Sequence, residues 1–372
     1  MSTEVNTALG TWSELFMLLA ALVYLCVFIC FAWDMASHSK ALGEAEKRTA
    51  TRSTSRSREL VGAAGGSSPA SATEHSEADE RDERNDSGAG SRAGSRRGAS
   101  EKLEGQVADP RMGYGTSERR PAARAAIVLM VMAFAIHVVA VVTRSIAAQR
   151  VPWGNMYEFS TTSALIIAGI YLIMLIRRDL RFVGVMISGL VTLLLTMATI
   201  AHPTPVSPLQ PVLQSYWLII HVSIAVASSA IFAVTFAMSV LQLIQDRRER
   251  RILAGGDPGW AFMRSVPSAK TLENFAYRLN SVGFVFWTFT LAAGAIWARD
   301  SWGRYWGWDP KEVWTFVIWV VYAAYLHARA TRGWTGARAA WLSIVGFLCI
   351  VFNYTIVNTY FPGLHSYAGL PG

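Results

Sequence analysis

Charged residues are scarce in this chain of 372 residues: they make up 16% of it, whereas hydrophobic residues make up 52%. A soluble domain typically carries about 25% charged residues, so the composition excludes an ordinary soluble protein. Cysteine is also rare, and no C-x-x-C-H occurs, which excludes a c-type haem attached to the chain itself. Cys26, Cys30 and Cys349 lie in apolar runs. The first two fit either small core residues or a metal or redox pair on one helix face.

The apolar residues form long uninterrupted runs instead of alternating with polar residues as in a soluble protein. Runs of about 18 or more apolar residues indicate transmembrane helices. They predict an all-α polytopic membrane protein with about eight spans. We expect these spans near 12–33, 124–143, 157–176, 182–200, 216–244, 280–298, 314–330 and 338–358. The first run lacks a basic leader and a small-residue cleavage site, so residues 1–33 are expected to be an uncleaved transmembrane anchor.

The loops between the runs differ in positive charge. Three of them together hold thirteen Lys or Arg: 177–181, 245–279 and 329–338. The three on the opposite side hold five: 144–156, 201–215 and 299–313. Because basic residues collect in short cytoplasmic loops, we expect both termini outside. The formal charge of +8 is then explained by topology, and no nucleic-acid partner is expected.

Residues 34–123 differ from the rest, since Ser, Gly, Ala, Arg and Glu dominate and aromatic residues are nearly missing. Such a segment buries too little apolar surface to offset its ordering entropy. We interpret it as a disordered cytoplasmic linker, with binding of nucleic acid or lipid headgroups by its arginines as the alternative. The compact part is then a seven-helix membrane domain, 124–372.

Trp302 to Trp314 reads WGRYWGWDPKEVW, with four tryptophans and a tyrosine in thirteen residues, and is expected outside, between spans six and seven. An interfacial aromatic belt accounts for one or two tryptophans at a helix end. The interleaved glycines and charges favour a platform for a flat apolar ligand with carboxylates on its rim. Haem has this shape.

The positions of the histidines support the interpretation of the aromatic segment as a haem platform. His221 lies about 9 Å along its helix from the outer start of span five, and His365 follows the last span on the same side. Both can reach the aromatic segment, and two imidazoles suit the two faces of an iron porphyrin. His327 lies about 20 Å deeper, near the cytoplasmic side. His137 is expected to be packed in span two, and His202 to be an exposed loop residue.

Five motifs occur in a familiar order along the chain: WGNMYEFS, QSYWLIIHVS, WGRYWGWDPKEVW, YLHARATRGWTG and FPGLHSYAG. With them the chain resembles the WWD-domain cytochrome c biogenesis proteins of the Ccs (Res) pathway, system II. These are the CcsA or ResC type, often called CcsB in actinobacteria. The resemblance covers nearly all of 124–372, whereas the first span and the long linker are less typical.

The resemblance implies binding of haem b, with His221 and His365 as outer axial ligands. It implies that His327 receives haem at an inner site, with a second ligand from another subunit. The expected haem surface comprises Trp302, Arg304, Trp306, Trp308, Asp309, Lys311 and Trp314. Arg304 and Lys311 either meet the propionates or serve as snorkelling or ion-pairing side chains beside Asp309 and Glu312. Asp309 and Pro310 are expected to cap span seven.

The implied function is presentation of haem outside a bacterial plasma membrane, for thioether attachment to the C-x-x-C-H of apocytochrome c. The implied partners are a ResB-like membrane subunit and a thiol-reducing thioredoxin-like protein with its membrane reductant donor. The chain would be the haem-presenting subunit of a holocytochrome c synthase complex. Two alternatives are a haem-b membrane electron carrier and a solute transporter or exporter with an aromatic gate.

Overall fold

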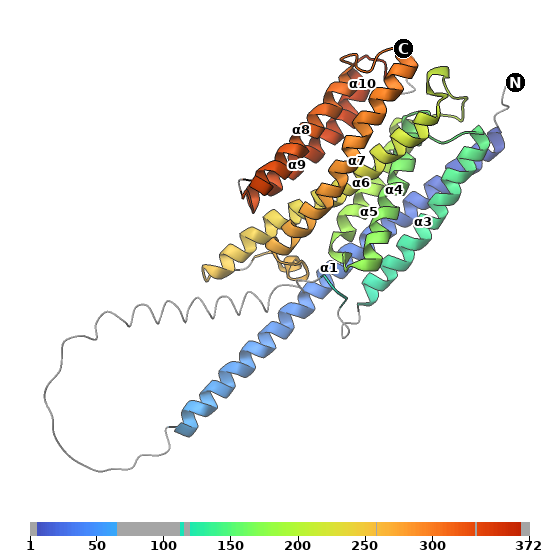
Figure 1. The fold of residues 1–372 in the computed structure, drawn as a ribbon. Coiled ribbons are helices and arrows are strands. Elements are labelled where there is room, and N and C mark those ends of the chain that lie inside the picture. Colours follow the sequence, from blue (N-terminus) through green and yellow to red (C-terminus); the bar gives the residue numbers. More distant parts are fainter. Residues whose placement is uncertain (1–5, 65–111, 115–119, 258, 332, 366–372) are drawn as a thin grey trace, which may run out of the picture.

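The computed structural model describes residues 6–64, 112–114, 120–257, 259–331 and 333–365, and within these ranges the regular structure is helical. Eight segments are long and apolar enough to cross a membrane, and they form an elongated bundle (Figure 1). They are Thr7–Ala45, Pro121–Ala148, Met156–Arg177, Arg181–Ala201, Tyr216–Leu253, Ala269–Trp302, Pro310–Thr331 and Ala337–Tyr360. The expected all-α fold with about eight spans is thereby confirmed.

The helices are α1 (Thr7–Ala64), α3 (Pro121–Ala148), α4 (Met156–Arg177), α5 (Gly184–Ala201), α6 (Tyr216–Leu253), α7 (Ala269–Trp302), α8 (Pro310–Thr331), α9 (Ala337–Phe352) and α10 (Asn358–Tyr360). A π-helical segment, η4 (Asn353–Val357), joins the last two, so the eighth span is α9, η4 and α10 together. A short 3₁₀ segment, η3 (Ala261–Ser265), lies between α6 and α7.

Local sequence explains where several helices begin. Asn155, Ser215 and Ser268 precede α4, α6 and α7, and each side chain accepts a hydrogen bond from a backbone N–H of the first turn. These residue types are favoured N-caps because they satisfy amides that have no partner within the helix. Helix α7 ends at Trp302 and is followed by Gly303. The φ of Gly303 is +72°, a left-handed conformation that glycine adopts without steric strain because it has no Cβ. The chain can therefore turn sharply into the aromatic segment.

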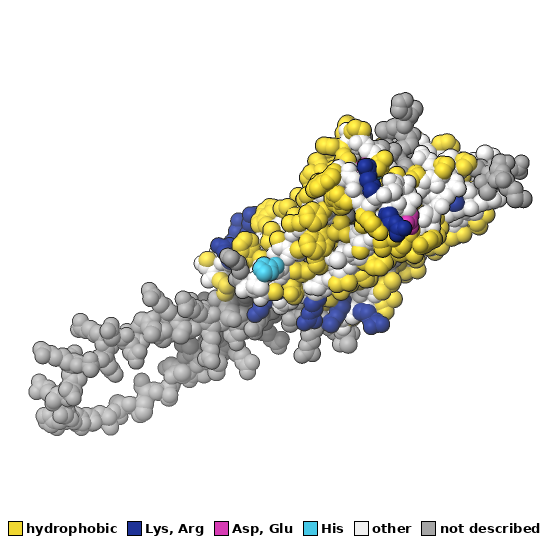
Figure 2. Space-filling model, turned by 45° about the horizontal axis from the view of Figure 1, so that its top comes forward, with side chains coloured by type: hydrophobic (Ala, Val, Ile, Leu, Met, Phe, Trp, Pro, Cys, Tyr) yellow, Lys and Arg dark blue, Asp and Glu magenta, His cyan; other side chains and the backbone are white. Residues whose placement is uncertain are grey.

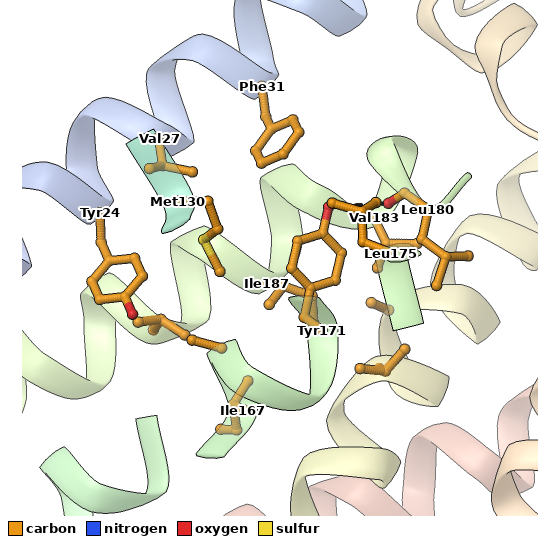
Figure 3. Packing of buried hydrophobic residues seen from close by; sticks show 14 of the residues in the cluster. Tyr24, Val27, Phe31, Met130, Ile167, Tyr171, Leu175, Leu180, Val183 and Ile187 are labelled. Atoms are coloured by element: carbon orange, nitrogen blue, oxygen red, sulfur yellow. Dashed lines mark hydrogen bonds between the residues drawn. The ribbon is translucent and has the colours of Figure 1, made fainter. Parts of the chain in front are cut away.

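The first core lies between α1, α3, α4 and α5. Figure 3 shows Tyr24 and Phe31 of α1 directed toward Met130, Tyr171 and neighbouring apolar side chains. Phe31 and Tyr171 meet edge to face with 6.4 Å between ring centroids. Helix α1 is therefore packed into the bundle as one of its walls.

The second core joins α6, α7, α8 and α9. The rings of Phe232 and Tyr322 stack with 3.7 Å between centroids. Two glycines make room for this pair, since a Cβ on Gly283 or on Gly346 would lie 2.8 Å from one of the two rings. Close helix approach at small residues is the usual basis of packing inside membranes, where lipid offers no hydrophobic drive between helices.

Helix α1 corrects the expected start of the linker. It remains helical to Ala64, through the first third of the range 34–123. Asp34 forms an ion pair with Arg120, and a Cβ on Gly43 would lie 2.5 Å from the guanidinium of Arg264. The composition that indicated disorder is also rich in Ala, Glu, Lys and Arg, which favour helix. The rest of the expected linker, apart from 112–114 and 120–123, lies outside the described residues.

The two ends of the bundle differ in what they carry. The start of α1 and the end of the last span lie at one end of the bundle, the terminal-bearing end, while the long part of α1 projects from the other (Figure 1). Figure 2 shows a surface dominated by hydrophobic side chains, with most of its Lys and Arg side chains toward the end from which α1 projects. The aromatic segment and the C-terminal histidine therefore lie at the end opposite most of the basic loops.

A buried ionic network fixes the loops at the terminal-bearing end. The Glu158 carboxylate is fully buried and accepts hydrogen bonds from Arg144, at 3.2 Å, from Arg150, at 2.7 Å, and from the Gly154 amide, at 2.9 Å. Both arginines also donate to backbone carbonyls of the loop between α5 and α6, those of Thr204 and Ser207. One carboxylate thus connects α3, α4 and two loops. The backbone amide of Glu158 donates to Oδ1 of Asn155, which caps the same turn.

Replacing Glu158 by Gln should lower the free energy of unfolding by about 3–5 kcal/mol, because two buried guanidinium groups would lose the buried carboxylate that they share while the side chain keeps its shape. Thermal unfolding of the detergent-solubilised protein measures the effect. Asp246→Asn is the control, since it breaks the solvent-exposed pair with Arg250 and should cost less than about 0.5 kcal/mol. Equal effects of the two substitutions would show that the buried network stabilises the protein no more than an exposed ion pair does.

Candidate functional site

His221 lies in α6 and faces α7 at the terminal-bearing end. Its Nδ1 is 3.0 Å from the carbonyl oxygen of Thr290. Because a carbonyl can only accept, Nδ1 carries the proton and Nε2 keeps its lone pair. The ring rests on Gly294, where a Cβ would lie 2.7 Å from Cε1, and it meets the ring of Trp297 edge-on at 5.7 Å between centroids. The imidazole is thus held in one orientation with one nitrogen free.

His365 follows α10 and is held by the aromatic segment. Its Nδ1 is 3.0 Å from Oδ1 of Asp309, and its ring lies edge-on to Trp302 at 4.8 Å between centroids. The neighbouring Leu364 amide donates to Oδ2 of Asp309 at 2.6 Å. Again the carboxylate accepts from Nδ1 and leaves Nε2 with its lone pair. Two imidazoles that are 144 residues apart in the sequence therefore have the same tautomer.

Asp309 also begins α8. Its Oδ1 accepts from the Lys311 amide at 3.0 Å, and Glu312 accepts in return from the Asp309 amide at 3.2 Å, which together form a capping box. The expected cap at Asp309 and Pro310 is confirmed. Burial alone would raise the pKa of Asp309, but the hydrogen bonds from His365 and from the Lys311 and Leu364 amides hold that pKa below its usual value. The carboxylate is therefore kept ionised opposite the imidazole.

Two adjoining cavities open beside the histidines. The loop cavity, about 120 Å³, is lined by residues of α7 and the aromatic segment, including Trp302, Tyr305, Trp306 and Glu312. The bundle cavity, about 170 Å³, is lined by residues near the starts of α4 and α6 and the end of the last span, including Trp153, Asn155, Phe159 and Asn358. Four residues line both: His221, Trp297, Lys311 and His365. Together the cavities approach the roughly 300–1,000 Å³ of typical ligand pockets.

The structure separates the expected surface residues into two groups. Trp302, Trp306 and Lys311 line the cavities with the two histidines. Asp309 acts behind them, through His365. Arg304, Trp308 and Trp314 do not line either cavity: the Arg304 guanidinium lies over Gly307, where a Cβ would come within 2.6 Å of its Nε. Trp314 packs on Phe352 of α9, with 4.4 Å between ring centroids.

Trp308 points away from the cavities and is 78% exposed. Its φ of +58° is unusual for a residue with a large side chain. The amides on either side of it, those of Gly307 and Asp309, both donate to Oε2 of Glu312, at 2.8 and 3.2 Å. These two bonds to one oxygen hold the left-handed turn that directs the ring outward.

The remaining histidines lie elsewhere. His327 is exposed on α8, near its end at Thr331, far along the helix from Lys311. This agrees with the expected separation from the outer pair. His137 is fully buried, with its ring edge-on to Tyr24 at 5.8 Å. His202, expected to be exposed, is half-buried, and its backbone amide donates a hydrogen bond to the carbonyl of Ala198 at the end of α5.

Several lining residues were missed from the sequence: Trp297, Gly294, Asn155 and Asn358. A signal existed for some of them. Gly294 is a glycine inside a helix, which often marks a close approach, and Trp297 follows three residues later. Asn155 lies within WGNMYEFS, one of the five motifs on which the family resemblance rests. Asn358 has no local signal, because its place depends on the π-helical segment before it.

The fold and the site define a helical integral membrane protein with a paired-imidazole aromatic pocket at one end of its bundle. A family model described as cytochrome C assembly protein matches residues 126–365, and the chain belongs to that family. The matched range contains both histidines, Asp309 and the whole aromatic segment. The chain therefore acts in cytochrome c biogenesis. This family membership implies that it handles haem and meets apocytochrome c and partner proteins.

Curated relatives carry the same description. The cytochrome c biogenesis protein CcsA of Guillardia theta is 35% identical over 243 residues, which are 61% of this chain and 80% of that protein. CcsA of Porphyra purpurea is 33% identical over 252 residues, 59% of this chain and 79% of its own length. CcsA of Synechococcus sp. (strain CC9902) is 40% identical over 177 residues, 43% and 58% of the two chains. The expected resemblance is confirmed at the level of the CcsA type.

Asp309→Asn should loosen the C-terminal segment while leaving α8 in place. Asn is as good an N-cap as Asp, but its single oxygen cannot serve both the cap and the Leu364 amide. Asp309→Ala removes both functions and should cost about 0.5–2 kcal/mol of stability. Amide hydrogen exchange of peptides covering 309–316 and 358–365 measures the two effects separately. Unchanged exchange at Leu364 in both variants would contradict the arrangement described here.

Proposed function

We propose that the chain binds haem b between Nε2 of His221 and Nε2 of His365 and presents it for covalent attachment to the C-x-x-C-H of apocytochrome c. One observation carries the proposal. Both imidazoles line the same pair of cavities, and each has its Nδ1 engaged by an oxygen acceptor. Metal-binding histidines are usually held in this way, with the second ring nitrogen fixing tautomer and orientation.

The surroundings suit a porphyrin. Trp302, Trp306 and Trp297 supply flat apolar faces on the walls, and Lys311 supplies a positive charge where the cavities meet. Imidazole is a good ligand for haem iron, and aromatic faces favour stacking on a flat ring. A haem would span the two cavities. Its iron would then lie near their shared residues.

The two ligands are anchored unequally, which suits transfer. His221 belongs to a helix packed within the bundle, whereas His365 lies on the segment after the last span and depends on Asp309 and Trp302. We infer that the histidine of an incoming C-x-x-C-H displaces His365. The haem supplies two vinyl groups, and each cysteine S–H adds across one of them, forming a C–S bond and placing hydrogen on the neighbouring carbon. The chain's own contribution is placement, which raises effective molarity.

His327 belongs to a second, inner site in this proposal. It is exposed on α8 at the end of the helix away from the cavities. A ResB-like membrane subunit would supply the other ligand there. Both termini and the aromatic segment would lie outside the plasma membrane of a bacterium, with residues 1–33 as anchor and 124–372 as the haem-handling domain. A thioredoxin-like protein and its membrane reductant donor would keep the cysteines of the apocytochrome reduced.

The visible spectrum tests the outer site. His221→Ala and His365→Ala should each remove one imidazole, so the low-spin Soret band should shift and the haem content measured as pyridine haemochrome should fall. Added imidazole should restore the low-spin spectrum, most readily for His365→Ala, because that ligand comes from the more loosely held segment. His202→Ala is the matched control, a histidine at the same end outside both cavities. Unchanged spectra in both cavity variants would contradict the assignment of His221 and His365 as ligands of the haem iron.

A second experiment separates the proposed function from the electron-carrier and exporter alternatives. The chain and a ResB-like subunit are co-expressed with an apocytochrome that contains C-x-x-C-H. Covalent haem detected on the apocytochrome by its peroxidase stain should depend on His221, His365 and His327, although only the first two should alter the outer Soret band. Equal covalent haem with and without this chain would contradict a role in presentation.

A further inference from the structure

The bundle cavity contains buried donors that have no partner among the described residues. Asn155 and Asn358 are 7% and 6% exposed, and the Nδ2 of each makes no hydrogen bond. The buried Nε1 of Trp297, on the wall shared with the loop cavity, is also unpaired. Buried polar groups are nearly always satisfied in proteins, so three unpaired donors around one cavity indicate a missing acceptor.

The orientation of Asn155 is fixed by its role as a cap. Its Oδ1 accepts from the Glu158 amide at 2.9 Å, so an exchange of the amide's oxygen and nitrogen would break the cap. Nδ2 is therefore the group of Asn155 that is left without a partner. Asn155 is further held because Glu158, in the same turn, is bound by two buried arginines.

Asn358 owes its position to the π-helical segment η4. Such segments are rare and occur often at functional sites, because the extra residue in the turn redirects side chains. Tyr354 in η4 contacts Ser160 of α4 through their hydroxyl groups, and its ring stacks on Phe159 at 5.5 Å between centroids. These contacts hold η4 against the start of α4. Asn358 and Asn155 therefore line the same cavity.

Charge distinguishes the two cavities. Among the residues that the structure describes, the bundle cavity is lined by Lys311 and by no Asp or Glu. The loop cavity includes Lys311 but also Glu312, whose carboxylate is fixed by two backbone amides. A ligand with a carboxylate edge is therefore repelled on the loop side and is offered a cation and neutral donors on the bundle side.

We propose that the bundle cavity is the subsite for the two propionates of haem, with Asn155, Asn358, Trp297 and Lys311 as donors. The inference rests on the proposed function and deepens it. The opposite, vinyl-bearing edge of the porphyrin then lies in the loop cavity beside Trp302 and Trp306, where an apocytochrome can approach. Arg304, an expected propionate partner, lies over Gly307 outside both cavities and has no part in this subsite.

The test compares haemin with haemin dimethyl ester, in which both propionates are esterified. The full-length protein in detergent is titrated with each, and binding is followed by the Soret band. The wild type should bind haemin on the order of tenfold or more tightly than the ester, because esterification removes the negative charges that pair with Lys311 and strengthen the hydrogen bonds from the neutral donors. Asn155→Asp and Asn358→Asp should lose most of this preference. Each replaces a donor with an acceptor at almost unchanged shape, and Asp keeps the cap at 155.

Asn155→Ser keeps the cap while shortening the side chain, and it replaces Asn155→Asp if a buried carboxylate prevents folding. Arg304→Gln is the matched control and should retain the full preference for haemin. Loss of the preference in Arg304→Gln, with retention in the Asn variants, would place the propionates in the loop and overturn the proposal.

The outcomes also separate this proposal from the one on which it rests. Equal, histidine-dependent binding of haemin and the ester by the wild type would overturn the propionate subsite and leave the axial pair intact. If neither porphyrin gives a low-spin spectrum in the wild type, the proposed haem site falls and the subsite falls with it.

Discussion

Asp309 accepts hydrogen bonds from the Lys311 amide, the Leu364 amide and the imidazole of His365. One carboxylate therefore begins α8, fixes the segment after the last span and sets the tautomer of a histidine 56 residues away. The segment that carries His365 has left the bundle, so it lacks the helical packing that holds His221. An ionised carboxylate is well suited to this task, because it offers acceptor sites in several directions and makes strong bonds to each donor.

The opposite wall of the pocket depends on a second carboxylate with a different role. Glu158 is fully buried and pairs with two arginines, one of which, Arg144, also lies 3.7 Å from the carboxylate of Glu14. Within a bilayer such charges are tolerated only when they pair with one another, so the network constrains the loops around it strongly. Its consequence for the pocket is precise placement of Asn155 and Trp153. The site thus lies between two rigid polar anchors, with apolar aromatic faces spanning the space between them.

Under the proposed function, this arrangement suits a haem that is first held and then released. In the proposal one imidazole belongs to a packed helix and the other to a tethered segment, so one side of the pocket is fixed and the other can open. The proposed placement of the propionates also determines which edge of the porphyrin faces the aromatic segment. A porphyrin held by its propionates on the bundle side would offer its reactive edge on the side of the aromatic segment. Trp308, turned outward beside that edge, widens the aromatic surface there.

The sequence by itself determined the eight spans and their order, because the length of an apolar run is a local property that burial in a membrane requires. It also determined the cap at Asp309 and the motifs that identify the family. Only the tertiary structure decided that Trp302 and Trp306 face the cavities while Trp314 packs on α9. It alone paired His365 with Asp309, and it made Gly294 the floor beneath His221. These facts depend on contacts between distant segments, which neither composition nor periodicity records.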